Sequence, residues 1–259
     1  MPPIVTLTTD FGTRDSYVAV MKGVLLSACP DLRIVDLTHD IAPQDVFGAA
    51  YFLAEAATWY PEGTIHCAVI DPGVGTTRLP IVVRARNYFF VGPDNGLLTF
   101  ISKKISIDEA RSITNPRFML PEISATFHGR DIFAPTAACL ARGAPMEEAG
   151  DRLTALTMLE IPCAKVDENG NLCGVVVHVD RFGNAITNIH RSQVPERKDV
   201  TVRIGSESVY GIHETYGDVD PGRSVALFGS ADYLEIAIHR GNAADKFGAH
   251  RGTRVEIRR

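Results

Sequence analysis

Two short stretches place titratable side chains on glycine-containing turns. In IDPGVGTTR a buried apolar strand ends at Asp71, Pro and Gly force a turn, and Arg78 closes the loop. In TFHGRDIFAP, His128 lies in a turn that leads into a predicted helix. Ligands bind at the carboxyl ends of strands in α/β sheets, and a histidine in a turn titrates near neutral pH. The two stretches therefore predict an Asp, Arg and His set that can orient a nucleophile or move a proton.

Each of these residues also has a purely structural interpretation. Asp71 can cap its own turn while Arg78 points into solvent. A single histidine in a turn, such as His128, is often structural. Arg130 and Asp131 can form a local ion pair that contributes little. The sequence leaves both interpretations open.

A third polar stretch lies in the second half of the chain. VDRFGNAITNI places Asp180 and Asn184 in an otherwise apolar strand pattern, and Phe182 offers a ring for stacking. A hairpin turn at FGN is the structural alternative. The turn VGPDNG is interpreted more simply, with Asp94 and Asn95 as turn formers.

The N-terminal TTDFG spells the metal-binding DFG of protein kinases. Only nine residues precede Asp10, whereas a kinase needs a Gly-rich loop, a strand lysine and an HRD loop before its DFG. GVGTTR also fails the GxGxxG pattern, because Arg78 occupies the last Gly position, and neither a P-loop nor a GxSxG elbow occurs. The sequence thus predicts neither a kinase nor a phosphate-cradling loop.

Apolar periodicity predicts the elements that must position these residues. Over the first half, strands alternate with helices, which indicates an α/β N-terminal domain with a layered sheet, assigned to residues 1–160. The predicted strands are 4–9, 33–39 and 64–71, the predicted helices are 17–29, 45–60 and 133–143, and a hairpin is predicted over 79–96.

The pattern changes after about residue 160. Short strands separated by turn-forming residues follow one another with no convincing helix between them. This spacing predicts a small antiparallel β-barrel as a C-terminal domain over residues 161–259.

Composition narrows the function classes. The chain has 259 residues, 45% of them hydrophobic and 22% charged, and a net charge of -5, so it offers no basic field for nucleic acid or an anionic membrane. No apolar run approaches the roughly 20 residues that span a bilayer, which favours a cytoplasmic protein. Five scattered cysteines favour buried, reduced thiols, and the eight histidines show no metal-ligand spacing, so no metal is expected.

Seven stretches in order resemble one family. They are TTDFGTRDSYVAVMKG, LTHDI, IDPGVGTTR, GPDNGLL, FHGRDIFAP, DRFGNAITNI and YLEIAIHRGNAA, and together they extend from residue 4 to about residue 245. This set resembles the S-adenosyl-L-methionine (SAM) hydroxide adenosyltransferases. These are adenosine-forming SAM hydrolases, related to the SAM-dependent fluorinases and chlorinases.

The resemblance implies a reaction and an assembly. SAM is the substrate, no cofactor is needed, and water or hydroxide attacks C5′ while methionine leaves. The residues that activate the water fall on Asp71, Arg78 and His128, and either His128 or Asp71 can be the terminal base. The family further implies a homotrimer, with SAM between the N-terminal domain of one chain and the C-terminal domain of its neighbour.

The resemblance also implies substrate-binding residues. Asp10 corresponds to the carboxylate that takes the ribose hydroxyls, and Asp180 with Asn184 to the pair that holds the methionine amino acid. Ser230 corresponds to a ligand of the methionine carboxylate, within Ser-Ala-Asp-Tyr where the family usually has Ser-x-Gly-Tyr. The remaining residues implied around adenine or methionine are Phe182, Tyr233, Asn242 and Ala243.

Two other functions remain as alternatives. A SAM-dependent halogenase needs a small dehydrated halide pocket, and the fluorinases carry an extra loop for which the compact RARNYFFVGPDNGLL leaves no room. A non-catalytic SAM or adenosine sensor would keep Asp10, Asp180 and Asn184 without needing the Asp, Arg and His set.

Overall fold

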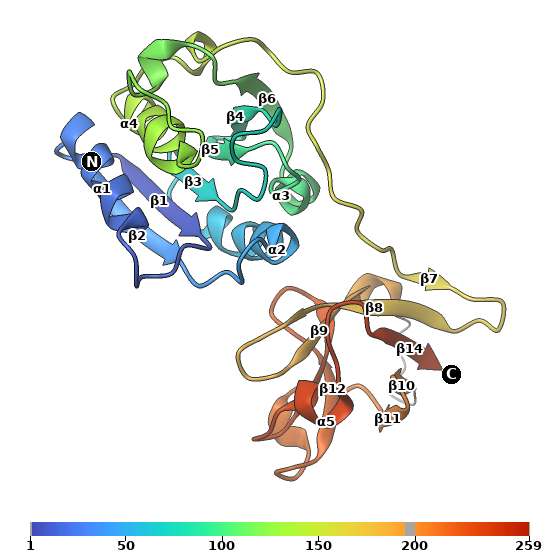
Figure 1. The fold of residues 1–259 in the computed structure, drawn as a ribbon. Coiled ribbons are helices and arrows are strands. Elements are labelled where there is room, and N and C mark those ends of the chain that lie inside the picture. Colours follow the sequence, from blue (N-terminus) through green and yellow to red (C-terminus); the bar gives the residue numbers. More distant parts are fainter. Residues whose placement is uncertain (1, 195–199, 259) are drawn as a thin grey trace. The chain divides into compact units, whose positions relative to one another are not determined.

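The computed structural model describes residues 2–194 and 200–258, which form two compact units, Met1–Leu159 and Glu160–Arg259 (Figure 1). Each unit has its own buried hydrophobic core.

A six-stranded sheet forms the centre of the N-terminal unit. Its order is β2-β1-β3-β5-β4-β6. β1, β2, β3 and β5 run parallel, while β4 is antiparallel to both β5 and β6. The strands are β1 (Ile4–Thr9), β2 (Arg33–Thr38), β3 (Ile65–Val69), β4 (Pro80–Ala85), β5 (Tyr88–Pro93) and β6 (Ile107–Ser112).

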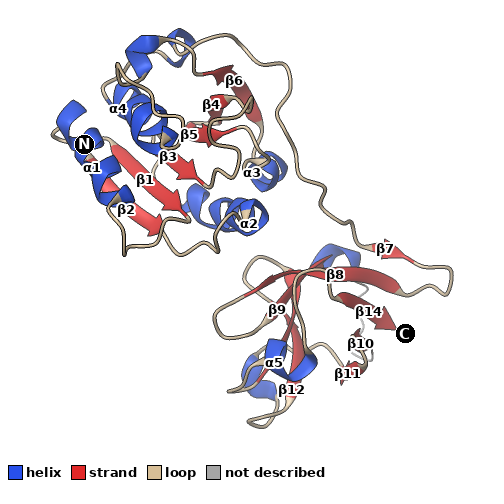
Figure 2. Ribbon diagram, in the orientation of Figure 1, coloured by secondary structure: helices blue, strands red, loops and turns tan. Residues whose placement is uncertain are grey.

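Helices cover both faces of this sheet (Figures 1 and 2). On one face α1 (Tyr17–Ala28) and α4 (Ala134–Ala141) bury Leu7 and Val69, and on the other α2 (Val46–Ala56) and α3 (Thr99–Lys104) bury Ala68 and Ile70. The alternating side chains of each strand therefore enter two separate cores, which explains the nearly continuous apolar runs. The predicted α/β class is confirmed.

Several element boundaries differ from the sequence prediction. The segments α3 and β6 were not predicted, because each has only six residues and lacks a clear apolar period. The predicted helix 133–143 is preceded by a π-helical turn, η3 (Gly129–Phe133). The predicted strand 64–71 ends at Val69 and leaves Asp71 in the following turn. The short 3-10 turns are η1 (Ala57–Trp59), η2 (Pro116–Phe118), η4 (Met146–Glu148), η5 (Arg191–Gln193) and η6 (Tyr216–Asp218).

The C-terminal unit is a nearly closed antiparallel β-barrel, as predicted. Its strand order is β11-β10-β14-β8-β9-β13-β12, and a bridge between His213 and Leu227 joins the two ends of this order. The strands are β7 (Lys165–Val166), which pairs with β8, β8 (Leu172–Val179), β9 (Ala185–His190), β10 (Thr201–Ile204), β11 (Glu207–Tyr210), β12 (Ser224–Phe228), β13 (Tyr233–Ile238) and β14 (Arg254–Arg258).

One prediction for this unit was wrong, because a short helix does lie between its strands. α5 (Ala243–Phe247) begins where the Asn242 side chain accepts a hydrogen bond from the Asp245 N–H, and it ends at Gly248 in a left-handed conformation. Both caps are local signals for a helix. Within the described part of the chain, none of the helices is long and apolar enough to cross a membrane.

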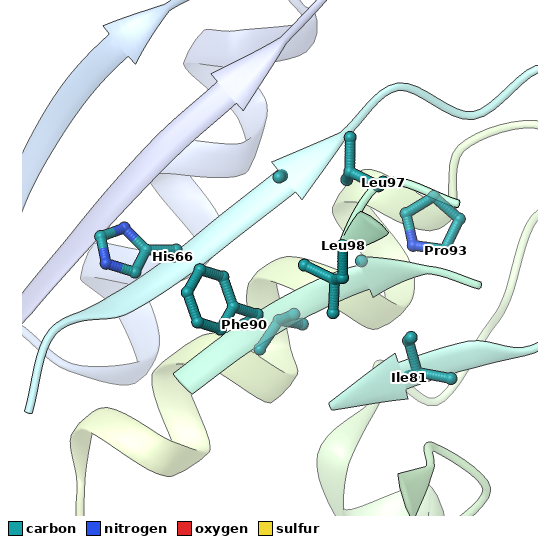
Figure 3. A pocket seen from close by; sticks show the side chains of 9 residues that line it. His66, Ile81, Phe90, Pro93, Leu97 and Leu98 are labelled. Carbon is teal, nitrogen blue, oxygen red and sulfur yellow. The ribbon is translucent and has the colours of Figure 1, made fainter. Parts of the chain in front are cut away.

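A small internal cavity lies in the N-terminal unit between β3, β4 and β5 (Figure 3). Its volume is about 10 Å³, and His66, Phe90 and Leu98 are among the residues that line it. This is room for no more than one water molecule. The cavity is therefore too small to bind a nucleoside.

Candidate functional site

The parallel strands bring three candidate stretches to one edge of the sheet. Asp10 follows β1, Asp71 follows β3, and Asp94 and Asn95 follow β5. Because β1, β3 and β5 are parallel neighbours, their carboxyl ends lie side by side. This edge is where open α/β sheets bind ligands.

Asp71, Arg78 and His128 are in direct contact. The Arg78 Nε donates to Asp71 Oδ1 at 2.9 Å, and Arg78 Nη2 donates to Asp71 Oδ2. The same Nη2 lies 2.7 Å from His128 Nδ1. The structure thus joins residues that are 50 positions apart in the sequence.

The Asp71 and Arg78 pair is almost buried, which argues against the interpretation that Arg78 points into solvent. Only 9% of the Arg78 side chain and 6% of the Asp71 side chain are exposed. The guanidinium also lies over the Phe133 ring, 5.3 Å from its centroid. Burying an ion pair costs desolvation energy and is a poor way to stabilise a fold. A buried pair of this kind at a strand end is therefore a candidate for function.

The contact with Arg78 defines the protonation state of His128. A guanidinium only donates hydrogen bonds, so Nδ1 must accept, and the neutral ring carries its proton on Nε2. Burial of the imidazole and the charge of Arg78 lower the pKa of His128, while Asp71 and Asp131 oppose that shift. His128 is therefore neutral near pH 7 and presents an N–H group at Nε2.

Close packing of two loops makes this contact possible. Gly75, in the loop between Asp71 and Arg78, has φ of 75°, and a Cβ atom there would lie 2.5 Å from the carbonyl oxygen of Ala125. Any residue other than glycine would be strained at this φ and would also push the loops apart.

Asp10 is held at the same edge by backbone contacts. Its Oδ2 accepts the N–H of Gln44 at 2.8 Å. The turn that carries it is fixed by His39, whose Nδ1 lies 2.9 Å from Thr9 Oγ1 and whose carbonyl accepts the Gly12 N–H. The carboxylate of Asp10 is thus oriented before any ligand binds.

Sequence reasoning assigned Asn95 only a turn-forming role and missed its position. Its Nδ2 donates to the carbonyl of Ile70 at 2.8 Å, directly before Asp71. Among the described residues, its buried Oδ1 has no hydrogen-bond partner. Asn95 therefore anchors the strand end that carries Asp71. Only its place after a neighbouring parallel strand could have signalled this.

In the C-terminal unit, Asp180 and Asn184 form a tight local turn. Asp180 Oδ1 accepts the N–H groups of Phe182 at 2.9 Å and Asn184 at 2.8 Å, and Oδ2 accepts Asn184 Nδ2 at 2.9 Å. The structure therefore brings these two candidate residues into direct contact. It also leaves the Phe182 ring 76% exposed at the tip of the turn.

Ser230 is exposed in the turn between β12 and β13. The last residue of that turn, Asp232, has φ of 59°, a conformation that glycine adopts most easily. Arg191 holds it there by donating from Nε to Asp232 Oδ1 and from its backbone N–H to the Asp232 carbonyl, each at 2.8 Å. Asp232 thus occupies the left-handed position of Ser-Ala-Asp-Tyr, where the family usually has glycine. Tyr233 follows, and its ring packs against His190.

Asn242 and Ala243 lie beside the Asp180 turn. The carbonyl of Gly183 accepts the N–H of Ala244 at 2.8 Å, so the start of α5 is docked onto that turn. The Asn242 side chain caps α5, and Ala243, the first residue of that helix, is fully buried in this unit.

Sequence reasoning also missed a carboxylate near Asp180. Glu235 on β13 accepts the Tyr216 hydroxyl at 2.7 Å. Burial, together with the charge of Asp180, raises the pKa of Glu235. Glu235 lies near the Asp180 turn because β13 pairs with β9, the strand that follows this turn. The sequence alone does not show this pairing.

One group of potential metal ligands lies elsewhere in the C-terminal unit. Single ligand atoms of Asp167, Cys173 and Glu256 lie within 4.8 Å of one another. Arg254 Nη2 lies 3.3 Å from Cys173 Sγ, and Arg258 forms an ion pair with Glu256. Two of the three side chains, Cys173 and Glu256, are therefore already in contact with a positively charged guanidinium group.

All five cysteines are free thiols, but the expected burial is only partly observed. Cys29 and Cys67 are buried, whereas Cys163 is exposed and the other two are half-buried. The apolar neighbours in the sequence did not reveal that Cys163 lies in the extended segment before β7.

Models of two protein domains match most of the chain. The SAM hydroxide adenosyltransferase N-terminal domain matches residues 5–150, and the C-terminal domain of the same family matches residues 174–256.

Full-length relatives carry two different names. A protein from Thermus thermophilus, named (R)-S-adenosyl-L-methionine hydrolase, is 40% identical over 99% of this chain and 100% of its own length. A protein of the same name from Salinispora tropica is 38% identical over 98% of this chain and 97% of its own. A fluorinase from Nocardia brasiliensis is 29% identical over 99% of this chain and 97% of its own.

A solved structure has the same fold. The crystal structure of a conserved protein from Thermotoga maritima superposes with a TM-score of 0.90 and 38% identity, covering 99% of this chain and 100% of that one. The chain belongs to the SAM hydroxide adenosyltransferase family.

Proposed function

We propose that this enzyme hydrolyses S-adenosyl-L-methionine to adenosine and L-methionine. The observation that carries the proposal is the buried contact of Asp71, Arg78 and His128 at the carboxyl edge of the sheet. Relatives named as hydrolases are 34–40% identical to the chain, whereas a fluorinase is 29% identical. The name of those hydrolases specifies (R)-S-adenosyl-L-methionine, and we include a preference for the (R) sulfonium epimer in the proposal.

The chemistry needs an activated water more than it needs an acid. The sulfonium of SAM is a good leaving group, because methionine departs as a neutral thioether. The site must hold water in line with the C5′–S bond and favour its ionised form. The positive charge of Arg78 stabilises developing hydroxide, and the low exposure of the pair strengthens that effect.

The contacts of the two candidate bases support different roles for them in this proposal. His128 Nδ1 is occupied by Arg78 and Nε2 carries a proton, so the ring is arranged to donate a hydrogen bond to the oxygen of the water. Asp71 is an acceptor-only group, and each of its oxygens has a second lone pair beyond the one directed at Arg78. In this proposal Asp71 takes the proton and His128 orients the nucleophile.

The binding roles complete the proposal. Asp10 accepts hydrogen bonds from the ribose hydroxyls. Its carboxylate suits this role because the Gln44 N–H already holds Oδ2 in place. Asp180, Asn184 and Ser230 hold the methionine end. The set around adenine or methionine is Phe182, Tyr233, Asn242 and Ala243. The enzyme works as a cytoplasmic homotrimer with SAM between subunits, and it needs neither cofactor nor metal.

Incubation of the purified protein with SAM tests the proposal. Adenosine and methionine should appear in equal amounts by chromatography, and with a mixture of sulfonium epimers the (R) epimer should be consumed first. Absence of adenosine above the buffer control contradicts hydrolysis. Formation of 5′-chloro-5′-deoxyadenosine in chloride would instead make the enzyme a halogenase, and tight SAM binding without any product would make it a sensor.

A further inference from the structure

The segment that leads to His128 has little secondary structure of its own. Residues 119–127 form bends and turns between η2 and η3. The contact of His128 with Arg78 therefore depends on whatever fixes this segment. Two of its backbone N–H groups, those of Leu120 and Ser124, are bound by a single residue, Asp131.

Asp131 is placed to close the segment. Its backbone carbonyl accepts the Leu120 N–H at 2.8 Å, and its Oδ2 accepts the Ser124 N–H at 2.8 Å. The residue is fully buried. Arg130 and Asp131 do form the local ion pair that the sequence suggested, but the pair is not without consequence, because a buried carboxylate without its donors would be costly.

Arg130 neutralises this carboxylate and attaches it to the segment. Its Nε donates to Asp131 Oδ1 at 2.6 Å and its Nη2 to Oδ2 at 3.1 Å. The guanidinium also lies over the Phe127 ring, 5.3 Å from the centroid. Phe127 directly precedes His128, so the ion pair holds both ends of the turn that carries the imidazole.

The π-helical turn η3 follows His128 and contains Asp131, and these two side chains point to different partners. The Phe127 carbonyl accepts the N–H groups of both Arg130 and Asp131, at 3.1 and 3.2 Å. Within η3 the Ala134 N–H bonds to the Gly129 carbonyl five residues back, and such widened turns occur frequently at functional sites. Here His128 contacts Arg78 while Asp131 binds back to the preceding segment.

We propose that Asp131 is a positioning residue for His128, closing the 119–127 segment so that the imidazole stays against Arg78. This inference rests on the proposed hydrolase function for its effect on turnover. Its structural part concerns His128 alone and is testable without turnover.

The charges that face His128 make the role measurable. Arg78 and Asp71 approach from the loop after β3, and Asp131, paired with Arg130, approaches from η3. Burial and the charge of Arg78 lower the pKa of His128 more than the negative charge of Asp131 raises it, so an imidazole released from Arg78 should titrate at higher pH. Removal of Arg130, which leaves the charge of Asp131 without its partner, should act in the same direction.

The test uses the full chain and the variants Asp131→Asn and Arg130→Gln. Asn keeps the shape and one acceptor oxygen while removing the charge. The titration of His128 is followed by NMR of ¹³C-labelled histidine, and kcat for SAM is measured over pH. Glu109→Gln is the matched control, because Glu109 is a poorly exposed carboxylate paired with two arginines on β4 and β6.

We expect Asp131→Asn to lower kcat at least tenfold, as misplacement of a catalytic group does, and to move the His128 titration to higher pH, because the imidazole leaves Arg78. Arg130→Gln should also move the titration to higher pH, and Glu109→Gln should leave it unchanged. An unmoved titration in Asp131→Asn, or one moved to lower pH by the loss of charge alone, overturns the inference, and so does an unchanged kcat. If the Asp131→Asn variant does not fold, the Arg130→Gln variant decides, and an unmoved His128 titration in that variant overturns the inference. If the wild type makes no adenosine, the proposed function fails while the titration still decides the role of Asp131.

Discussion

The polar residues of the two units are held in place in different ways. In the N-terminal unit, Asp71 and Arg78 come from the loop after β3 and His128 from a second loop, and the three satisfy one another at the carboxyl edge of the parallel strands. In the C-terminal unit, Asp180 and Asn184 are four residues apart and bond within their own turn. The first cluster depends on the whole α/β fold, whereas the second depends on one hairpin. A substitution should therefore disturb chemistry in the first and local binding geometry in the second.

The largest expected effect is loss of Arg78. Arg78→Ala removes the charge that stabilises hydroxide and leaves Asp71 buried without its partner, so kcat should fall about a thousandfold. Adenosine formation under saturating SAM measures the loss. Retention of more than a tenth of the wild-type kcat would show that the long-range cluster is not the catalytic one.

His66 is another histidine of the N-terminal unit, and it is buried away from the Asp71, Arg78 and His128 cluster. We expect it to affect the stability of the fold and not the reaction. Its Nδ1 lies 2.8 Å from Thr6 Oγ1 and its ring stacks on Phe90, with no described partner at Nε2. Burial lowers its pKa from 6.5 to about 4.

Between these two pKa values the unfolded chain binds a proton that the folded chain does not. Stability conferred by neutral His66 is therefore complete above about pH 6.5 and falls as the pH drops toward 4, by up to about 3 kcal/mol. Urea unfolding at pH 7.5 and 4.5 measures the difference. His66→Asn should reduce the pH dependence, and an unchanged slope in this variant would refute the assignment.

His128→Ala should lower kcat about a hundredfold, which corresponds to about 2.7 kcal/mol of transition-state stabilisation. SAM should still bind, because the imidazole is assigned to the water rather than to the substrate. Single-turnover assays combined with calorimetric binding separate the two effects. Loss of binding with the loss of kcat would make His128 a structural residue.

The smallest expected effect belongs to the local turn. Asp180→Asn keeps Oδ1 as the acceptor for two backbone N–H groups but removes the negative charge, so the free energy of unfolding should fall by only about 1 kcal/mol. KM for SAM should rise more than kcat falls. A drop in kcat as large as that of the His128 variant would remove the distinction between the two regions.

Particular residues show what could be predicted from the sequence. Glycines and proline next to Asp71 and His128 marked turns, and the predicted strand before Asp71 put that residue at the carboxyl end of a strand. Asp180 and Asn184 were recognisable because their contacts span only four residues. The barrel followed from evenly spaced short strands, although α5 and β11 were too short for a periodic signal.

The sequence by itself determined the candidate chemistry and the class of each unit, because composition, turns and apolar periods act over a few residues. The tertiary structure alone decided that Arg78 contacts both Asp71 and His128, that Nδ1 of His128 accepts, and that Asn95 and Asp131 support the strand end and the segment before His128. Apart from that of Arg78 with Asp71, these contacts join residues from different segments of the chain. Their geometry depends on how the loops pack against one another, as the close approach of Gly75 to Ala125 shows, and no local pattern encodes that packing.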